Sequence, residues 1–200
     1  MIDIASLPFS VIAAENFVEK LFQDRLPEHL TFHNMVHTRN VTAAVDELCD
    51  YENVETPDRE TVLLAAVFHD TGYTVKYAGH EAESCIIAEK YLRKMRRSVD
   101  EIRVILNCIE ATEMPQHPSD FLSKILCDAD MAHLAAKDFF AQTDRLRREW
   151  RVVKNQEMTD EKWYRSNIEF LDAHRYFTPY ARIFWETRKE VNIGRLLQKI

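Results

Sequence analysis

The sequence of 200 residues is poor in glycine, with only Gly72, Gly79 and Gly194. A sheet of many strands needs frequent tight turns, and glycine adopts the backbone conformations of such turns more readily than other residues. So few glycines argue against such a sheet and favour helices. We therefore expect an all-α protein.

The sequence also has no apolar run that approaches the roughly 18 residues of a membrane-spanning helix. Asp3 lies near the N-terminus, where no positively charged segment precedes an apolar stretch as it would in a secretory signal. The four cysteines form no C-x-x-C pair, so we expect reduced residues of the core. These absences predict a cytoplasmic protein with no membrane partner.

The sequence is also poor in positive charge. It has 26 lysines and arginines but 33 acidic residues, which gives a formal net charge of -7. Binding to long nucleic acids or to anionic membranes requires clustered basic residues, so the balance argues against both. A short basic stretch spans residues 93–97, and on a helix we interpret it as a solvated face.

Apolar residues instead recur at helical spacing along the chain. The run at residues 62–68 is apolar nearly all round, so its helix should lie at the centre of the protein. Ser98 and Glu101 form a capping-box pattern that predicts a helix start. The predicted helical segments are 11–26, 37–51, 59–69, 81–97, one that begins after residue 98, 119–136, and two or three more in the remainder. We expect one domain over residues 1–200, with a motif-bearing core at about 30–135 and a helical extension at 136–200.

Imidazoles and carboxylates gather at three places where packing does not require them. Phe-His-Asn-Met-Val-His at residues 32–37 puts His33 and His37 four residues apart, which places them on one face of a helix. Phe-His-Asp-Thr-Gly at residues 68–72 ends the most apolar helix in adjacent His69 and Asp70. An apolar segment then runs into Asp-Ala-Asp at residues 128–130. Burying such groups becomes tolerable when a cation compensates them, and they are good ligands for Mn, Fe, Ni, Co, Zn or Mg.

Each place also has a structural interpretation. A single histidine such as His37 is usually a hydrogen-bonded core residue, and the pair His69 and Asp70 could simply end a helix. Asp128 and Asp130 could be helix caps. The order of the motifs, a histidine, then His-Asp after a buried helix, then an aspartate well downstream, favours a common site.

These three motifs in this order resemble the HD superfamily of metal-dependent phosphohydrolases, over roughly residues 30–135. The resemblance implies a single-domain helical bundle of the HD-domain type with a divalent metal ion at its centre. It also implies that His37 is the first ligand, His69 and Asp70 are the middle pair, and a later acid is the fourth. Two residues apart on a helix, Asp128 and Asp130 point about 200° apart and cannot both face one ion. We choose Asp130, since the family's ligand usually follows a small residue, and leave Asp128 as a cap or supporting group or, alternatively, as the ligand.

Further residues of the active site follow from the same resemblance and from position. His33 resembles the histidine that protonates the leaving group in the cyclic-nucleotide phosphodiesterase branch, and it otherwise has a structural role. His33 and Asp70 are thus the predicted catalytic residues. Lys76 and His80 lie shortly after the His-Asp pair, so they are predicted to bind the substrate, with solvated loop residues as the alternative.

The predicted function is hydrolysis of a small phosphoester, either a phosphomonoester or a cyclic phosphodiester, by water activated at a metal ion. Similarity to the family suggests a nucleotide substrate. One alternative is a di-iron oxygenase of the HD type, for which His80 and His117 would have to complete the ligands. Another is a non-catalytic nucleotide-sensing or interaction module. The aromatic residues of the extension are expected in the core or in dimer contacts rather than stacked on bases, and a homodimer is compatible with the sequence.

Overall fold

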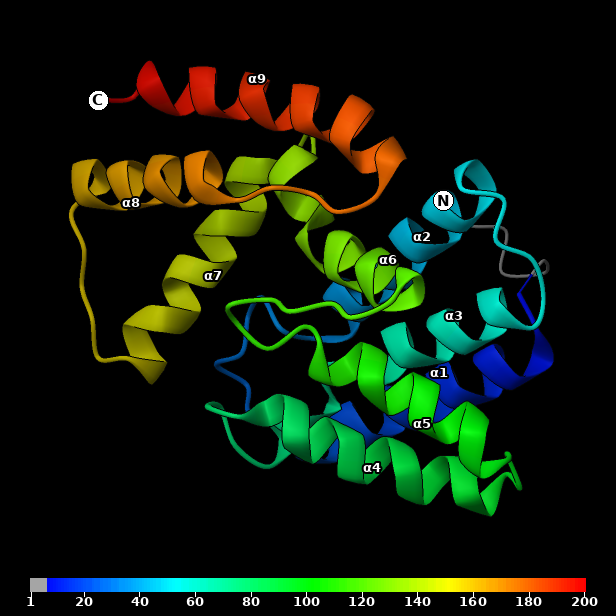
Figure 1. The fold of residues 1–200 in the computed structure, drawn as a ribbon. Coiled ribbons are helices and arrows are strands. Elements are labelled where there is room, and N and C mark those ends of the chain that lie inside the picture. Colours follow the sequence, from blue (N-terminus) through cyan, green and yellow to red (C-terminus); the bar gives the residue numbers. More distant parts are fainter. Residues whose placement is uncertain (1–6) are drawn as a thin grey trace.

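Helices make up the regular structure of this protein in the computed structural model, which describes residues 7–200 (Figure 1). No strand occurs within these residues, so the predicted all-α class is confirmed. The first six helices are α1 (Phe9–Arg25), α2 (Met35–Tyr51), α3 (Asp58–Phe68), α4 (His80–Lys94), α5 (Val99–Glu110) and α6 (Phe121–Asp130). They are followed by α7 (Phe139–Val153), α8 (Asp160–Ala173) and α9 (Glu186–Leu197).

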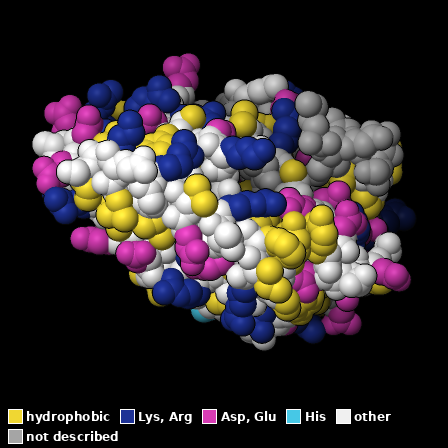
Figure 2. Space-filling model, turned by 90° about the horizontal axis from the view of Figure 1, so that it is seen from above, with side chains coloured by type: hydrophobic (Ala, Val, Ile, Leu, Met, Phe, Trp, Pro, Cys, Tyr) yellow, Lys and Arg dark blue, Asp and Glu magenta, His cyan; other side chains and the backbone are white. Residues whose placement is uncertain are grey.

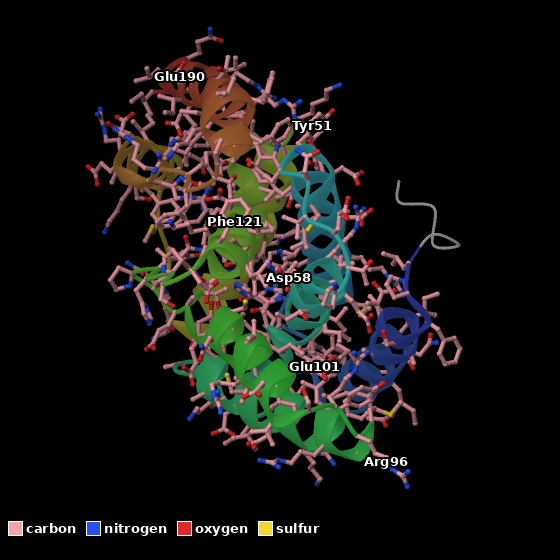
Figure 3. The ribbon with its side chains drawn as sticks, turned by 45° about the vertical axis from the view of Figure 1, so that its right-hand side comes forward. Tyr51, Asp58, Arg96, Glu101, Phe121 and Glu190 are labelled. Atoms are coloured by element: carbon pink, nitrogen blue, oxygen red, sulfur yellow. The ribbon has the colours of Figure 1, made fainter. Side chains whose placement is uncertain are left out.

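Helix α3 lies at the centre of the core, as its apolar sequence predicts. Every side chain from Val62 to Phe68 is at most 1% exposed. The helix packs against α1, α2, α4, α5 and α6, and Figure 3 shows α1 on one side of α2 and α3, with α5 and α6 on the other. Because α3 is surrounded by other helices, the residues that follow its last turn lie in the interior of the protein.

Local signals in the sequence explain where several helices begin and end. Ser98 and Glu101 form the expected capping box at the start of α5. Asn34 caps α2, since its side chain accepts a hydrogen bond from the N–H of Val36. Helix α4 ends at Lys94 rather than at residue 97 because Arg96 takes a left-handed backbone conformation, with φ of 58°.

The segment at residues 119–136 differs from a continuous helix. Helix α6 ends at Asp130, and a tighter 3-10 turn, η3 (Met131–Ala135), takes over immediately. Helix α7 contacts this turn. The acid chosen from the sequence as fourth ligand is therefore the last residue of a helix, beside the extension.

The extension contacts the core at α6 and η3, and also at α2 and the segment before it. In Figure 1, α8 and α9 run side by side and α7 lies across one end of α8. The side chain of Asn192, on α9, donates hydrogen bonds to the carbonyl oxygens of Leu134 and Ala136 at 2.9 and 3.0 Å. Residues 136–200 thus rest on the same turn that follows Asp130.

The surface carries charges of both signs. Figure 2 shows basic and acidic side chains interspersed on the face seen from above, with no continuous basic stripe on that face. The four cysteines are buried and free, as expected. Among the described helices, none combines the length and the apolar character needed to cross a bilayer.

Candidate metal centre

His69 and Asp70 follow the last turn of α3 and are almost completely buried, with 1% and 4% exposure. The Nδ1 of His69 lies 2.7 Å from the carbonyl oxygen of Ala66. Because a carbonyl only accepts, Nδ1 carries a proton there, and Nε2 is the ring atom that faces His37 and Asp70. The fold thus turns Nε2, the nitrogen that a metal ion would use, to the interior of the site.

Gly72 explains the end of this motif. It lies in a 3-10 turn, η2 (Thr71–Thr74), and its N–H donates to Ser84 Oγ at 2.7 Å. A Cβ atom on Gly72 would come within 1.9 Å of the carbonyl oxygen of His80. Glycine is required because the first turn of α4 packs directly on this backbone, which brings His80 back to Asp70.

His37 from α2 and Asp130 from α6 complete the cluster. The Nε2 atoms of His37 and His69 are 3.4 Å apart, and Asp70 Oδ2 lies 3.4 and 3.3 Å from them. Asp130 Oδ1 lies 3.1 Å from His37 Nε2 and 3.7 Å from His69 Nε2. All four residues predicted as ligands therefore meet at one point, although they come from three segments of the chain.

The donor atoms of this cluster fit a divalent cation. One ligand atom from each of His37, His69 and Asp70 lies within 4.8 Å of the other two, and the group could hold a metal ion. Asp70 Oδ2 is buried and has no hydrogen-bond partner among the described residues. Burial lowers the pKa of His69, but the charges of Asp70 and Asp130 outweigh this effect and raise it well above its ordinary value. The site attracts positive charge, and imidazole nitrogen with carboxylate oxygen suits Zn, Mn, Fe and similar ions.

Asp128 points away from this cluster. Its carboxylate accepts hydrogen bonds from the N–H groups of Phe177 and Thr178 at 2.8 and 2.7 Å, and from Thr178 Oγ1 at 2.7 Å. It therefore holds the segment that leads into the last helix. The structure places Asp130 beside the histidines and leaves Asp128 as the supporting group.

His33 lies next to the cluster and is held by a residue that the sequence analysis did not single out. Glu149, on α7, has no exposed side-chain surface, and its Oε1 lies 2.5 Å from His33 Nδ1. Its Oε2 accepts hydrogen bonds from the N–H groups of Phe32 and His33. Burial acts to raise the pKa of Glu149, but these hydrogen bonds outweigh it and hold the pKa below its ordinary value. Glu149 is thus ionised at neutral pH, and His33 Nδ1 donates to it.

His80 and Lys76 differ in their placement. His80 Nε2 lies 3.2 Å from Asp70 Oδ1, and its ring stacks on Tyr73 with centroids 3.7 Å apart. Lys76 instead pairs with Glu83 at 2.9 Å, and it does not line the cavity described below. The structure brings His80 to the site as a partner of Asp70 and leaves Lys76 outside the cavity wall.

A cavity of about 640 Å³ opens on the cluster. Its wall includes Asp70, Asp130, His33 and His80 from the predicted site. Residues without a motif signal also line it, among them Tyr73, His133 and the aromatic side chains of α7 and α8. His117 lies on an exposed loop and does not line this cavity.

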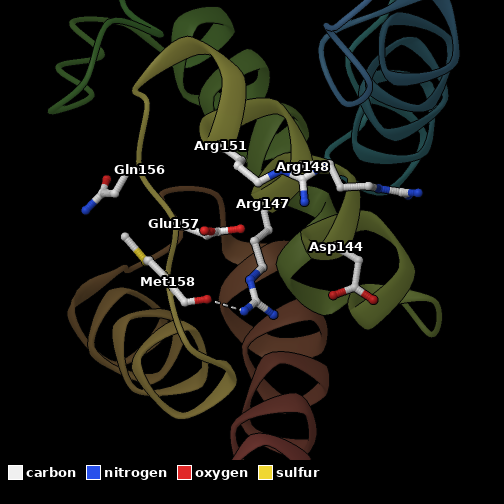
Figure 4. Close-up of a pocket in the computed structure, with 7 residues that line it drawn as sticks. All are labelled: Asp144, Arg147, Arg148, Arg151, Gln156, Glu157 and Met158. Atoms are coloured by element: carbon white, nitrogen blue, oxygen red, sulfur yellow. Dashed lines mark hydrogen bonds between the residues drawn. The ribbon is translucent and has the colours of Figure 1, made fainter.

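A second hollow, of about 370 Å³, lies beside α7 and the loop after it (Figure 4). Arg147 is tied there to Asp160 at 2.7 Å and to the carbonyl oxygen of Met158 at 2.5 Å. None of the histidines and acids of the cluster lines it. Arg147 therefore fixes the loop at residues 154–159. The cluster borders the larger cavity through Asp70 and Asp130, and it also borders a third hollow of about 330 Å³, whose wall includes His37 and Asp130.

Comparisons with known proteins agree with this geometry. The sequence model of the HD domain family matches residues 35–135, half of the chain, and this chain therefore belongs to the HD domain family. A solved structure described as a predicted HD superfamily hydrolase, from an uncultured Thermotogales bacterium, has a similar fold with a TM-score of 0.67. It is 18% identical in sequence, and the match covers 98% of this chain and 93% of that one. No match is found among curated proteins.

Proposed function

We propose that this protein is a metal-dependent phosphohydrolase that acts on a small phosphoester. One observation carries the proposal: His37, His69, Asp70 and Asp130 converge, and the buried oxygen Asp70 Oδ2 has no hydrogen-bond partner among the described residues. Family membership supports it, since the HD family contains phosphohydrolases of this type. A nucleotide is the substrate class that the resemblance suggests.

These four residues would hold a divalent ion. When bound, the ion lowers the pKa of a coordinated water and polarises the phosphoryl oxygen. His69 Nδ1 and His80 fix the orientation of this centre, because they are hydrogen-bonded to Ala66 and placed against Asp70. The substrate enters from the 640 Å³ cavity, on whose wall Asp70 and Asp130 lie.

His33 is the group that moves a proton. Its Nδ1 donates to the Glu149 carboxylate, which leaves Nε2 without a hydrogen bond to the described residues, on a ring that lines the cavity. In its protonated form His33 gives the Nε2 proton to the leaving oxygen of the ester, and Glu149 stabilises that form. Glu149 is accordingly a positioning residue for His33.

The oxygenase alternative is less well supported. It requires His117 to complete a six-ligand set, and His117 lies on an exposed loop away from the cavity wall. A non-catalytic module has no need for a buried carboxylate oxygen without a partner, nor for a histidine held by a buried glutamate. Both observations favour hydrolysis.

The test is metal analysis of the purified protein and of His69→Ala, followed by a panel of phosphoesters with Mn, Mg, Ni, Co and Zn. We expect the wild type to bind metal, the variant to lose it, and phosphate release to fall about a thousandfold or more. His117→Ala is the matched control, and it should keep both metal and activity. Bound iron without phosphate release would favour the oxygenase, and metal-independent release would contradict the proposed mechanism.

A further inference from the structure

The candidate metal centre borders two hollows with different walls. Asp70, His33 and His80 line the cavity of about 640 Å³ but do not line the third hollow, of about 330 Å³. His37 lines only the third hollow, and Asp130 lines both. The cluster is therefore open on two sides, and the substrate of the proposed function occupies only one of them.

Helix α2 forms one side of the third hollow. The residues that line it there have the spacing of one helical face and are His37, Asn40, Ala44 and Glu47. This face begins beside the candidate centre, in the first turn of α2, and continues for ten residues, about 15 Å along the helix axis. Ala43 and Ala44 have short side chains, so the helix leaves space along this face.

The opposite side of the hollow comes from η3 and the extension, and its residues include Asp138, Gln142 and Arg188. Asn40, Asp138 and Arg188 are exposed, whereas His37 is buried. The hollow thus connects the ring of His37 with the surface of the protein. A volume of about 330 Å³ has room for on the order of ten water molecules. A small hydrated species fits within it.

The charges around this hollow favour a cation. Asp130, Glu47 and Asp138 are acidic, and Arg188 is the one lysine or arginine among the described residues of the wall. Glu47 accepts a hydrogen bond from the hydroxyl of Tyr180 at 2.9 Å and forms no ion pair with the described residues. Its charge is therefore not neutralised by a neighbour. A cleft with carboxylates on its wall raises the local concentration of cations and speeds their association.

We propose that the third hollow is the route by which a divalent cation reaches and leaves the candidate metal centre, with Glu47 attracting the cation at the far end of the α2 face. This inference rests on the proposed function, because His37 and Asp130 act as ligands only if the centre holds a metal ion. A phosphoester in the larger cavity is negatively charged and fills the approach past Asp70. A separate route allows the cation to exchange while substrate is bound.

The experiment is stopped-flow mixing of the full-length, metal-free protein with cobalt(II), whose visible absorption reports coordination. Asn40→Trp places an indole over the approach to His37, and we expect it to slow association about tenfold or more. Release of cobalt to an excess of chelator should slow by the same factor, so the equilibrium affinity should stay the same. A variant that disturbed the ligands would weaken the affinity instead.

Val36→Trp is the matched control. Val36 lies on the same helix and is 54% exposed, but it lines neither hollow at the centre. Its rates of cobalt association and release should equal those of the wild type. Association that is equally fast in Asn40→Trp and in the wild type would overturn the inference and direct the cation through the larger cavity.

Two charge variants test the route without adding bulk. Glu47→Gln keeps an acceptor for Tyr180 but removes the charge, and it should slow association about threefold at low salt. Arg188→Gln should speed association by a similar factor. Both effects should shrink as the ionic strength rises, which a change in folding would not cause. If circular dichroism shows that Asn40→Trp is unfolded, these opposite effects decide, and equal rates in both charge variants would overturn the inference.

Phosphate release measured in parallel separates this inference from the proposed function. Slower cobalt exchange in Asn40→Trp without any hydrolysis by the wild type would support the route and contradict the phosphohydrolase. Metal-dependent hydrolysis with unchanged exchange in Asn40→Trp would preserve the phosphohydrolase and overturn the route. A wild-type protein that binds no cobalt would overturn both.

Discussion

Residues 35–135 and residues 136–200 reach the same cavity but contribute different side chains to it. The first part, which the HD family model matches, supplies His37, His69, Asp70 and Asp130. The second part, outside that match, supplies Glu149 and the aromatic side chains of α7 and α8 that line the cavity. Under the proposed function, the family core would hold the metal ion, whereas the extension would position His33 through Glu149 and line part of the cavity.

The strongest test of this division compares the two aspartates at the end of α6. Asp130→Ala should lower phosphate release about a thousandfold and weaken metal binding, because it removes a carboxylate from the centre. Asp128→Ala should instead destabilise the protein by about 2–4 kcal/mol, since it leaves the N–H groups of Phe177 and Thr178 without their acceptor. Metal titration and denaturant unfolding measure the two effects.

The opposite pattern would contradict the roles assigned to the two aspartates. If Asp128→Ala lost metal while Asp130→Ala retained it, the fourth ligand would be Asp128 and the extension would be attached in another way.

Glu149→Gln tests the contribution of the extension to the reaction. The amide keeps the size of the side chain but no longer stabilises a protonated His33, so we expect kcat to fall about a hundredfold while metal content stays unchanged. The pH profile of kcat should change as well, which a purely structural role would not cause. The same substitution at an exposed position, Glu157→Gln on the loop after α7, serves as the control.

A smaller effect is expected from His174, which should make the stability of the protein fall at acid pH. Burial and, to a smaller extent, the charge of Lys189 together lower the pKa of His174 to about 3, whereas an unfolded histidine titrates near 6.5. The unfolded chain therefore binds the extra proton, and the contribution of His174 to stability is complete above about pH 6.5 and is lost as the pH falls toward 3.

His174→Leu should flatten this dependence. Between pH 6 and 4 we expect the free energy of unfolding of the wild type to fall by up to about 1.4 kcal/mol per pH unit more steeply than that of the variant. The exposed His29→Leu is the control. Parallel curves for His174→Leu and the wild type would contradict the assignment.

Much of the fold and the metal centre could be predicted because the signals are local. The apolar run at 62–68 predicts the central helix, and Ser98 with Glu101 predicts the start of α5. The opposed directions of Asp128 and Asp130 follow from helical geometry, since α6 stays helical through Asp130. In each case a few neighbouring residues determine the outcome.

Glu149 could not be predicted in this way. It is 116 residues from His33 along the chain and lies between arginines and Trp150 in a segment that has the composition of a solvated helix. The place of Trp163 and Phe170 in the cavity wall could not be predicted either, because their spacing also suits an ordinary core face, and Trp163 is 2% exposed. Contacts between residues far apart in the sequence, at the turn after Asp130 and between Glu149 and the N–H groups of Phe32 and His33, place α7 and α8 beside the cavity.

Glu149 and Trp150 are adjacent residues of α7. A movement of this helix would therefore affect both the positioning of His33 and the shape of the cavity. Glu149 holds the ring of His33, and Trp150 lines the cavity of about 640 Å³ beside the candidate metal centre. A ligand that pushes on the indole and shifts α7 also moves the carboxylate that orients the imidazole. A poorly fitting substrate would therefore misalign its own proton donor, so that selectivity would appear in turnover as well as in affinity.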